Sequence, residues 1–321
     1  MEYRRLGRTG LRVSTICLGT MQFGWSTEEA QAHKIMSEAV ALGCNFLDTA
    51  DVYSRWVEGN PGGVSEQMIG NWLASGSVRR EDVIVATKVR SKMGDGPNDE
   101  GLSRVHILNS VRDSLGRLQT DYIDLYQVHW PDEETPLEET LRALDDLIRS
   151  GLVRYIGCSN YPAWLLAKAL WISDVRNMAR FDSLQPHYNY VHRAEFEREL
   201  QPLCIDQQIG VIPYSPLAGG FLTGKYRRAS EAPDSARASG IRQRYMNEQG
   251  FTAVDKLEKI GLQQGATVAQ TAIAWILANP AVTSAIIGAN SLDQLHDTMK
   301  GAEFALSAEE KSILDGITAW E

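Results

Sequence analysis

Short apolar runs rich in β-branched residues alternate along the chain with longer stretches in which apolar residues recur at helical spacing. This alternation is typical of repeated β-α units that build a parallel sheet. It predicts eight strands, at residues 16–18, 45–47, 83–87, 122–128, 153–156, 183–185, 210–213 and 284–287. Residues 3–13, interrupted by the glycine-containing segment 7–10, predict a separate β-hairpin.

Helices are expected between the strands, and several show a Ser or Thr followed three residues later by an acid or an amide. This spacing is the pattern of a capping box, in which the two side chains satisfy free N–H groups at the helix start. The four pairs are Ser26 with Glu29, Thr135 with Glu138, Ser291 with Gln294, and Ser307 with Glu310.

Eight β-α units can form an open, doubly wound sheet or close into a barrel. The length of 321 residues and the regular spacing favour a (β/α)8 barrel, with the hairpin covering its bottom. No linker or charge block divides the chain, so residues 1–321 are expected to form one domain. Residues 218–250 are the exception to the short loops and are expected to cover a ligand.

Composition and charge narrow the possible partners. The net charge of -9 argues against binding to nucleic acid, which needs clustered cations, but it leaves a small anionic cofactor possible. No apolar run approaches the ~18 residues of a membrane span, and the N-terminus lacks the apolar segment of a secretion signal. The four cysteines form no C-x-x-C pair and are expected to be buried, free thiols. We therefore expect a cytoplasmic protein with a small-molecule substrate and neither a membrane nor a nucleic-acid partner.

Four ionisable residues fall where consecutive predicted strands end. Asp48 ends the second strand, Tyr53 lies in the loop after it, Lys88 ends the third and His129 ends the fourth. In a closed barrel the functional site lies at these carboxyl ends. A phenol has a pKa near ~10, and an adjacent ammonium lowers it, so Lys88 would make Tyr53 a better proton donor. Asp48 would then be the counter-ion of Lys88, and His129 would donate toward an oxygen that gains negative charge as a carbonyl is reduced.

Each of these residues also has a structural explanation when it is taken alone. A Lys–Asp pair at a barrel end can be a structural ion pair, and a histidine beside Trp130 can be a packed imidazole. The coincidence of all four residue types at consecutive strand ends favours the catalytic interpretation.

Seven collinear motifs connect the chain to a known family: LGRTGLRVS, NFLDTADVYS, SEQMIGNWL, VIVATKV, DYIDLYQVHWPD, GLVRYIGCSN and YSPLAGGFLTGKY. Through them residues 6–298 resemble the aldo-keto reductases. The resemblance implies reversible, nicotinamide-dependent reduction of an aldehyde, ketone or sugar-like carbonyl. It also implies that Tyr53 is the general acid, that Lys88 and Asp48 tune it, and that His129 orients the substrate.

The same resemblance implies a cofactor site. Ser159, Asn160 and Gln185 correspond to residues that hold the nicotinamide carboxamide, and Tyr214 to the ring that stacks on the nicotinamide. A helix cap is the alternative interpretation of Ser159 and Asn160. The remaining positions that match cofactor-binding residues of the family are Gly19, Thr20, Met21, Asp48, Ser215, Leu217, Gly219, Lys225, Arg237, Gly288, Gln294 and Asp297.

The nucleotide motifs of other families are incomplete or absent. Residues 219–226, GGFLTGKY, fall one residue short of a phosphate-binding P-loop because Tyr226 stands in place of Ser or Thr. No G-x-G-x-x-G occurs, so a Rossmann site is not expected. Where many relatives carry a basic residue near Gly288, this chain has none, so NADP(H) is only weakly favoured over NAD(H).

Trp25, Trp56 and Trp130, together with Met21, lie in loops at the expected catalytic end and are candidates for an apolar substrate wall, although each can equally be loop core. The tail after Ala305 is short, which predicts an open pocket. No metal site is expected, because the histidines of HYNYVH lack an acid partner at ligand spacing. A second function stays open: potassium-channel β subunits resemble the same family, so the chain could be a cofactor-binding, redox-sensing regulatory subunit.

Overall fold

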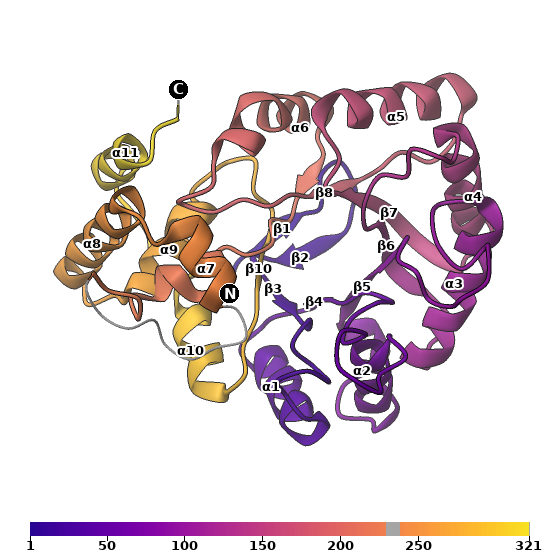
Figure 1. The fold of residues 1–321 in the computed structure, drawn as a ribbon, viewed down its shortest axis with the longest axis horizontal. Helices are drawn as coiled ribbons and strands as arrows, with labels where there is room; N and C mark the ends of the chain where they lie inside the picture. Colours follow the sequence, from indigo (N-terminus) through magenta and orange to yellow (C-terminus); the bar gives the residue numbers. More distant parts are fainter. Residues whose placement is uncertain (229–237, 321) are drawn as a thin grey trace.

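Eight parallel strands form a (β/α)8 barrel ringed by helices (Figure 1). The computed structural model describes residues 1–228 and 238–320. The barrel strands are β3 (Ile16–Gly19), β4 (Phe46–Asp48), β5 (Ile84–Val89), β6 (Ile123–Val128), β7 (Val153–Ser159), β8 (Ser183–Gln185), β9 (Gly210–Val211) and β10 (Ala285–Ile287). The eight predicted strands and the barrel are confirmed.

The barrel closes through its last strand. β10 pairs in parallel with β3, with Ala285 opposite Ile16. On its other side, Thr283 N–H donates to the carbonyl of Val211 (2.8 Å) and Ile286 N–H to the carbonyl of Pro213 (3.0 Å). All strands run in the same direction, so their carboxyl ends meet at one rim and loops far apart in sequence become neighbours there.

The barrel interior is a packed core. Alternate residues of the strands point inward, because side chains of a strand alternate between its two faces. The inward cluster consists of Leu6, Val13, Cys17, Phe46, Ile84, Ala86, Leu125, Ile212 and Ile286. The outward-facing residues of the same strands pack against the ring of helices in a second, larger core.

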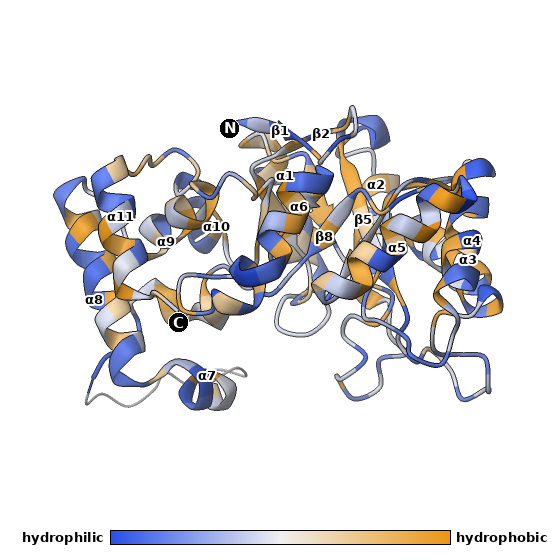
Figure 2. Ribbon diagram, turned by 90° about the horizontal axis from the view of Figure 1, so that it is seen from above, coloured by the Kyte–Doolittle hydropathy of each residue, from blue (hydrophilic) through white to orange (hydrophobic). Residues whose placement is uncertain are grey.

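The predicted hairpin is confirmed and lies at the amino-terminal end of the barrel. β1 (Tyr3–Arg5) and β2 (Arg12–Ser14) pair antiparallel. Leu6 and Val13 insert into the inward cluster. In Figure 2 this hairpin lies at the end of the molecule opposite to α7 (Ala238–Tyr245). The other rim is therefore left for a functional site.

Amphipathic helices surround the strands, with hydrophilic and hydrophobic residues on different sides of α8 and α11 (Figure 2). Their bounds are α1 (Glu29–Ala41), α2 (Val64–Ala74), α3 (Arg104–Leu118), α4 (Leu137–Arg149), α5 (Ala163–Arg176), α6 (Gln201–Gln207), α8 (Glu248–Gln263), α9 (Val268–Leu277), α10 (Leu292–Lys300) and α11 (Ala308–Ile317), with short turns η1 (Arg80–Asp82), η2 (Phe196–Leu200) and η3 (Ala218–Thr223).

Two of the four predicted capping pairs are wrong. α1 begins after Glu28 and α4 after Pro136, so Ser26 and Thr135 lie outside the cap positions. Their hydroxyls donate instead to loop side chains, Ser26 to Asn290 and Thr135 to Asp132. Ser291 and Ser307 do cap α10 and α11, and Ser307 forms the full box with Glu310.

The long segment 218–250 is more structured than expected. It contains η3, α7 and the start of α8, while residues 229–237 lie outside the described part of the chain. All four cysteines are buried and free within the described residues, as predicted. Over residues 1–228 and 238–320, no helix combines the length and apolar character that crossing a membrane requires.

Candidate active site

The ammonium of Lys88 is the centre of the site. Lys88 is fully buried near the end of β5, and its Nζ lies 2.5 Å from Asp48 Oδ1 and 3.0 Å from the Tyr53 hydroxyl. It also donates to the carbonyl of Thr49 (2.8 Å), so all three ammonium hydrogens have an acceptor. β4 and β5 pair with Asp48 opposite Ala86, which places Asp48 and Lys88 at the same rim of the barrel.

Two buried amides hold the other oxygen of Asp48. Gln127 Nε2 donates to Oδ2 at 3.0 Å and Gln185 Nε2 at 2.8 Å. The carboxylate thus links β4 to β5, β6 and β8. Gln127 was missed in the sequence, although a glutamine inside the apolar strand IDLYQV is a signal of a buried polar contact.

The net direction of the Tyr53 pKa shift differs from the expectation. Burial raises the pKa of Tyr53 above its ordinary value; the nearby Lys88 lowers it, as predicted, but does not outweigh burial. Burial also acts to lower the pKa of Lys88, while Asp48 and Tyr53 raise it above its ordinary value. The pair at neutral pH is therefore a protonated phenol hydrogen-bonded to a charged ammonium.

His129 is a neutral imidazole beside Tyr53. The two ring centroids are 6.0 Å apart at an interplanar angle of 72°. Burial, and then the positive charges of Lys88 and Arg90, lower the pKa of His129 to about 3. Its buried Nδ1 has no hydrogen-bond partner among the described residues. A neutral imidazole carries one N–H donor and one acceptor nitrogen.

The residues expected around the nicotinamide come together at the ends of β7, β8 and β9. The Tyr214 hydroxyl donates to Asn160 Oδ1 (3.0 Å), Asn160 Nδ2 donates to the carbonyl of His129 (3.0 Å), and Ser159 Oγ donates to the carbonyl of Gln185 (2.8 Å). The helix-cap interpretation of Ser159 and Asn160 is wrong, because α5 begins after Pro162 and its first turn has no side-chain cap among the described residues.

The turn after Tyr214 contains the residues expected to hold the cofactor's phosphates. Ser215, Ala218, Gly219 and Gly220 all have left-handed backbone conformations, with φ of 55°, 51°, 70° and 108°. The N–H groups of Ala218 and Gly220 already donate to the carbonyls of Ser215 and Leu217, so an anion at this turn would depend on the other N–H groups of the turn and on Lys225. A Cβ added to Gly220 would lie 3.3 Å from Nζ of Lys225, so a cation lies beside the turn. The residues present fit a pyrophosphate, with Leu217 at the start of η3; Arg237 lies outside the described residues.

Some of the other residues expected to bind the cofactor are exposed, and others already form hydrogen bonds within the protein. Gly288 and Gln294 are exposed after β10. Asp297 is turned toward the start of α9, where its Oδ1 accepts from Thr267 and Gln270. Thr20 is buried and its hydroxyl donates to the Asp48 carbonyl (3.0 Å). Gly19 and Met21 precede and follow it at the end of β3.

The three candidate substrate tryptophans form two groups. Trp56 packs edge-on against Trp25 (ring centroids 5.7 Å apart) and against Tyr53 (6.2 Å). Trp56 and Trp130 are 48% and 49% exposed, so both can offer a face to a ligand. Trp130 lines a different opening, described next.

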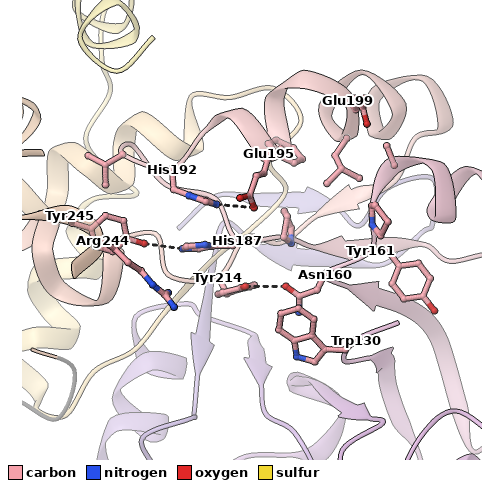
Figure 3. A pocket seen from close by; sticks show the side chains of 16 residues that line it. Trp130, Asn160, Tyr161, His187, His192, Glu195, Glu199, Tyr214, Arg244 and Tyr245 are labelled. Carbon is pink, nitrogen blue, oxygen red and sulfur yellow. Dashed lines mark hydrogen bonds and ion pairs between the residues drawn. The ribbon is translucent and has the colours of Figure 1, made fainter. Parts of the chain in front are cut away.

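A pocket of about 920 Å³ opens beside Tyr214 and Asn160 (Figure 3). We call it the side pocket; its lining includes Trp130, Asn160, His187, Tyr214, Arg244 and Tyr245. Sequence reasoning missed Arg244 and Tyr245, because helix α7 reaches the rim from a segment that the pattern presented as a loop. Within residues 1–228 and 238–320, no three His, Cys, Asp or Glu side chains are grouped to hold a metal ion.

Comparison with known proteins agrees with this geometry. The profile of the Aldo/keto reductase family matches residues 15–319. The chain is 41% identical to the uncharacterized oxidoreductase YrpG of Bacillus subtilis (strain 168), over 99% of this chain and 96% of that protein. It is 36% identical to a probable voltage-gated potassium channel subunit beta of Arabidopsis thaliana (94% and 92%). It is 35% identical to versiconal hemiacetal acetate reductase of Aspergillus parasiticus (98% and 96%).

Proposed function

Because the chain belongs to the aldo/keto reductase family, we propose that it is a nicotinamide-dependent carbonyl reductase in which Tyr53 donates the proton. The family and the relatives named as an oxidoreductase and a reductase support a general oxidoreductase role. The proposed reaction converts an aldehyde, ketone or sugar-like carbonyl to the alcohol, reversibly, with NADP(H) preferred to NAD(H).

The observation that carries this proposal is the contact of 3.0 Å between Lys88 Nζ and the Tyr53 hydroxyl. The ammonium donates to the phenolic oxygen, so the phenolic hydrogen points elsewhere and is free for a substrate oxygen. When the proton leaves, the phenolate stays beside the fixed, buried positive charge of Lys88. Preorganised charges of this kind stabilise a transition state more strongly than water does.

The remaining residues orient the reacting groups. Asp48 holds the ammonium in place and is itself held by two amides. The neutral His129 directs an N–H at the carbonyl oxygen and so aligns it with Tyr53. Tyr214 and Asn160 would hold the nicotinamide of the cofactor and the turn at Gly220 its phosphates; when bound, the reduced cofactor would supply a hydride.

The first test is Tyr53→Phe, with Tyr3→Phe on the distant hairpin as the matched control. Removing a general acid typically lowers turnover by about 10²–10⁴-fold. We expect that loss for Tyr53→Phe, with the dissociation constants for NADPH and NADH within about twofold of the parent protein, since this change leaves the stacking and anion-binding residues intact. The assay follows NADPH and NADH oxidation with a panel of aldehydes, ketones and keto-sugars. Full activity of Tyr53→Phe would refute the proposed role.

A regulatory subunit is the second candidate, favoured by the 36% identity to a protein named as a potassium channel subunit beta. It predicts cofactor binding with negligible turnover on every carbonyl in the same panel. Rapid turnover of any of these compounds, lost in Tyr53→Phe, would decide for the reductase.

A further inference from the structure

Three aromatic rings are stacked next to the proposed nicotinamide site (Figure 3). The ring centroid of His187 lies 4.1 Å from that of His192 and 5.1 Å from that of Tyr214, with interplanar angles of 25° and 11°. His187 and Tyr214 are paired in an isolated parallel bridge, and Tyr214 N–H donates to the carbonyl of Pro186 (3.0 Å). The backbone thus holds the two residues side by side, and their rings lie face to face.

The imidazole of His187 is itself held in one orientation. Its Nε2 lies 3.2 Å from the Tyr245 hydroxyl and 3.4 Å from Asn189 Nδ2. Both neighbours can donate, which is consistent with an unprotonated Nε2 that accepts. Burial, and then His192 and Arg244, lower the pKa of His187 to about 4, so the ring is neutral at physiological pH.

Tyr214 is fixed at two places by this arrangement. Its hydroxyl is hydrogen-bonded to Asn160 at the end of β7, and one face of its ring is covered by His187. A hydrogen bond at one end still allows the ring to tilt, whereas a stacked neighbour determines its plane. The uncovered face is the one that a nicotinamide would use in the proposed function.

Building on the proposed function, we propose that His187 is a positioning residue whose ring sets the plane of Tyr214 and, through it, the orientation of the stacked nicotinamide. His187 does not touch the reacting atoms. Without the His187 ring, the plane of the Tyr214 ring should be less restricted. Cofactor binding should then weaken, and the selection between the two hydrogens at nicotinamide C4 should become less strict.

The test compares two substitutions that separate stacking from hydrogen bonding. His187→Gln keeps a polar acceptor for Tyr245 and removes the ring, whereas His187→Phe keeps a ring and removes the acceptor. His33→Gln, on α1 in the outer helix layer, is the matched control. The readouts are the dissociation constants for NADPH and NADH by fluorescence titration, which need no substrate, and the isotope retained after turnover with (4R)- and (4S)-deuterated cofactor.

We expect His187→Gln to raise the dissociation constant about three- to tenfold, the range that an aromatic pair contributes, and to transfer a measurable fraction of the wrong hydrogen. His187→Phe and His33→Gln should stay within about twofold of the parent protein. If His187→Gln fails to fold by circular dichroism, His187→Leu, which also removes the aromatic ring from the stack, replaces it and should weaken binding in the same direction.

The outcomes separate this inference from the function on which it depends. A parent protein that binds neither NADPH nor NADH overturns both. A parent protein that binds and reduces normally, with His187→Gln (or its replacement) unchanged, overturns only the role of His187. Equal impairment of His187→Gln and His187→Phe overturns it as well, because the hydrogen bond and not the stack would then be responsible.

Discussion

A fully buried lysine is costly, and its neighbours explain why it is tolerated. Desolvating an ammonium and a carboxylate costs several kcal/mol per ion, which attraction alone offsets only in very good geometry. Here Lys88 is 0% and Asp48 2% exposed, and the hydrogen-bonding capacity of both is filled by Thr49, Tyr53 and two glutamine amides. Such a pair adds little to stability compared with apolar side chains of similar volume, which is consistent with the proposed catalytic role.

Asp48→Asn should destabilise the protein strongly, because it leaves the Lys88 ammonium buried without its counter-ion. Removing one partner of a buried pair costs about 3–5 kcal/mol. Urea unfolding measures this change. Asp82→Asn, in the exposed Arg79–Asp82 pair, is the control and should change the free energy of unfolding little, since solvent screens that pair. Similar effects of the two substitutions would contradict the structural picture.

The depressed pKa of His129 predicts a pH dependence of stability. The folded protein keeps this ring neutral down to about pH 3, whereas the unfolded chain binds a proton near the ordinary value of 6.5. Protons therefore favour the unfolded state between these values, and the free energy of unfolding should fall as the pH is lowered from about 6.5 toward 3, by at most about 1.4 kcal/mol per pH unit from this group.

His129→Asn removes that contribution, so its free energy of unfolding should fall less steeply with decreasing pH than that of the parent protein. Urea titrations at pH 7, 6 and 5 measure the two slopes. Leu262→Ala, which changes an exposed side chain without a titratable group, serves as the control and should keep the parent slope. Parallel slopes for His129→Asn and the parent would show that His129 is not held neutral.

At the residue level, the sequence predicted the neighbours of a side chain more successfully than it predicted the direction of its pKa shift. Asp48, Tyr53 and Lys88 could be placed together because strand ends define a rim. The net direction of the Tyr53 pKa could not, since it depends on depth of burial, which the loops determine. Gln127 was missed because its partner Asp48 lies on another strand. His187 was considered only as a metal ligand, because Tyr214 and Tyr245, which contact it, lie in a loop and a helix distant in sequence.

Helix starts show the limits of a local pattern. Thr267 and Gln270 form a full capping box on α9 that was not predicted, whereas Ser26 has the right spacing and lies outside the cap of α1. The three-residue spacing indicates which residues can form a capping box. Tertiary contacts determine whether the helix begins there. Ser26 is bonded to Asn290 from the other end of the chain, a contact that no local pattern reveals.

Thr267→Ala tests this distinction between real and apparent caps. Loss of a Thr cap costs about 0.5–2 kcal/mol, and here it also removes a hydrogen bond to Asp297. Ser26→Ala should have a clearly smaller effect, because it leaves the start of α1 intact. Thermal and urea unfolding of both variants gives the comparison. The explanation fails if Ser26→Ala is the more damaging of the two.

At the scale of the whole molecule, the pattern predicted the architecture because it repeats. Eight β-α units, each with its own apolar signals, left few ways to arrange the chain, and the antiparallel hairpin was recognisable as a departure from that repeat. The helices of the segment 218–250 were not predicted, since α7 is short and its apolar residues, Ile241 and Tyr245, are buried against the rest of the protein rather than arranged in an obvious stripe.

Gly7→Ala should show how tightly the hairpin is packed against the bottom of the barrel. Gly7 has a φ of 57°, and an added Cβ would lie 2.5 Å from the carbonyl oxygen of Gln208 and 2.7 Å from that of Asp182. Overpacking against backbone atoms costs about 1–3 kcal/mol, and the left-handed conformation adds to it.

Gly10→Ala is the matched control, because it lies in the same hairpin and an added Cβ would meet nothing within 4 Å. Urea unfolding of the two variants should separate them clearly. Equal stabilities would mean that the hairpin is not seated on the barrel in solution.

The carboxylate of Asp48 receives donors from β5, β6 and β8, so strands from both halves of the chain converge on one side chain. A half-built barrel would contain the nucleus of the site without the amide that β8 contributes. Assembly of this contact set therefore depends on β8 joining the sheet, well after the first strands of the chain. In the proposed reductase, activity would appear only once that strand is in place.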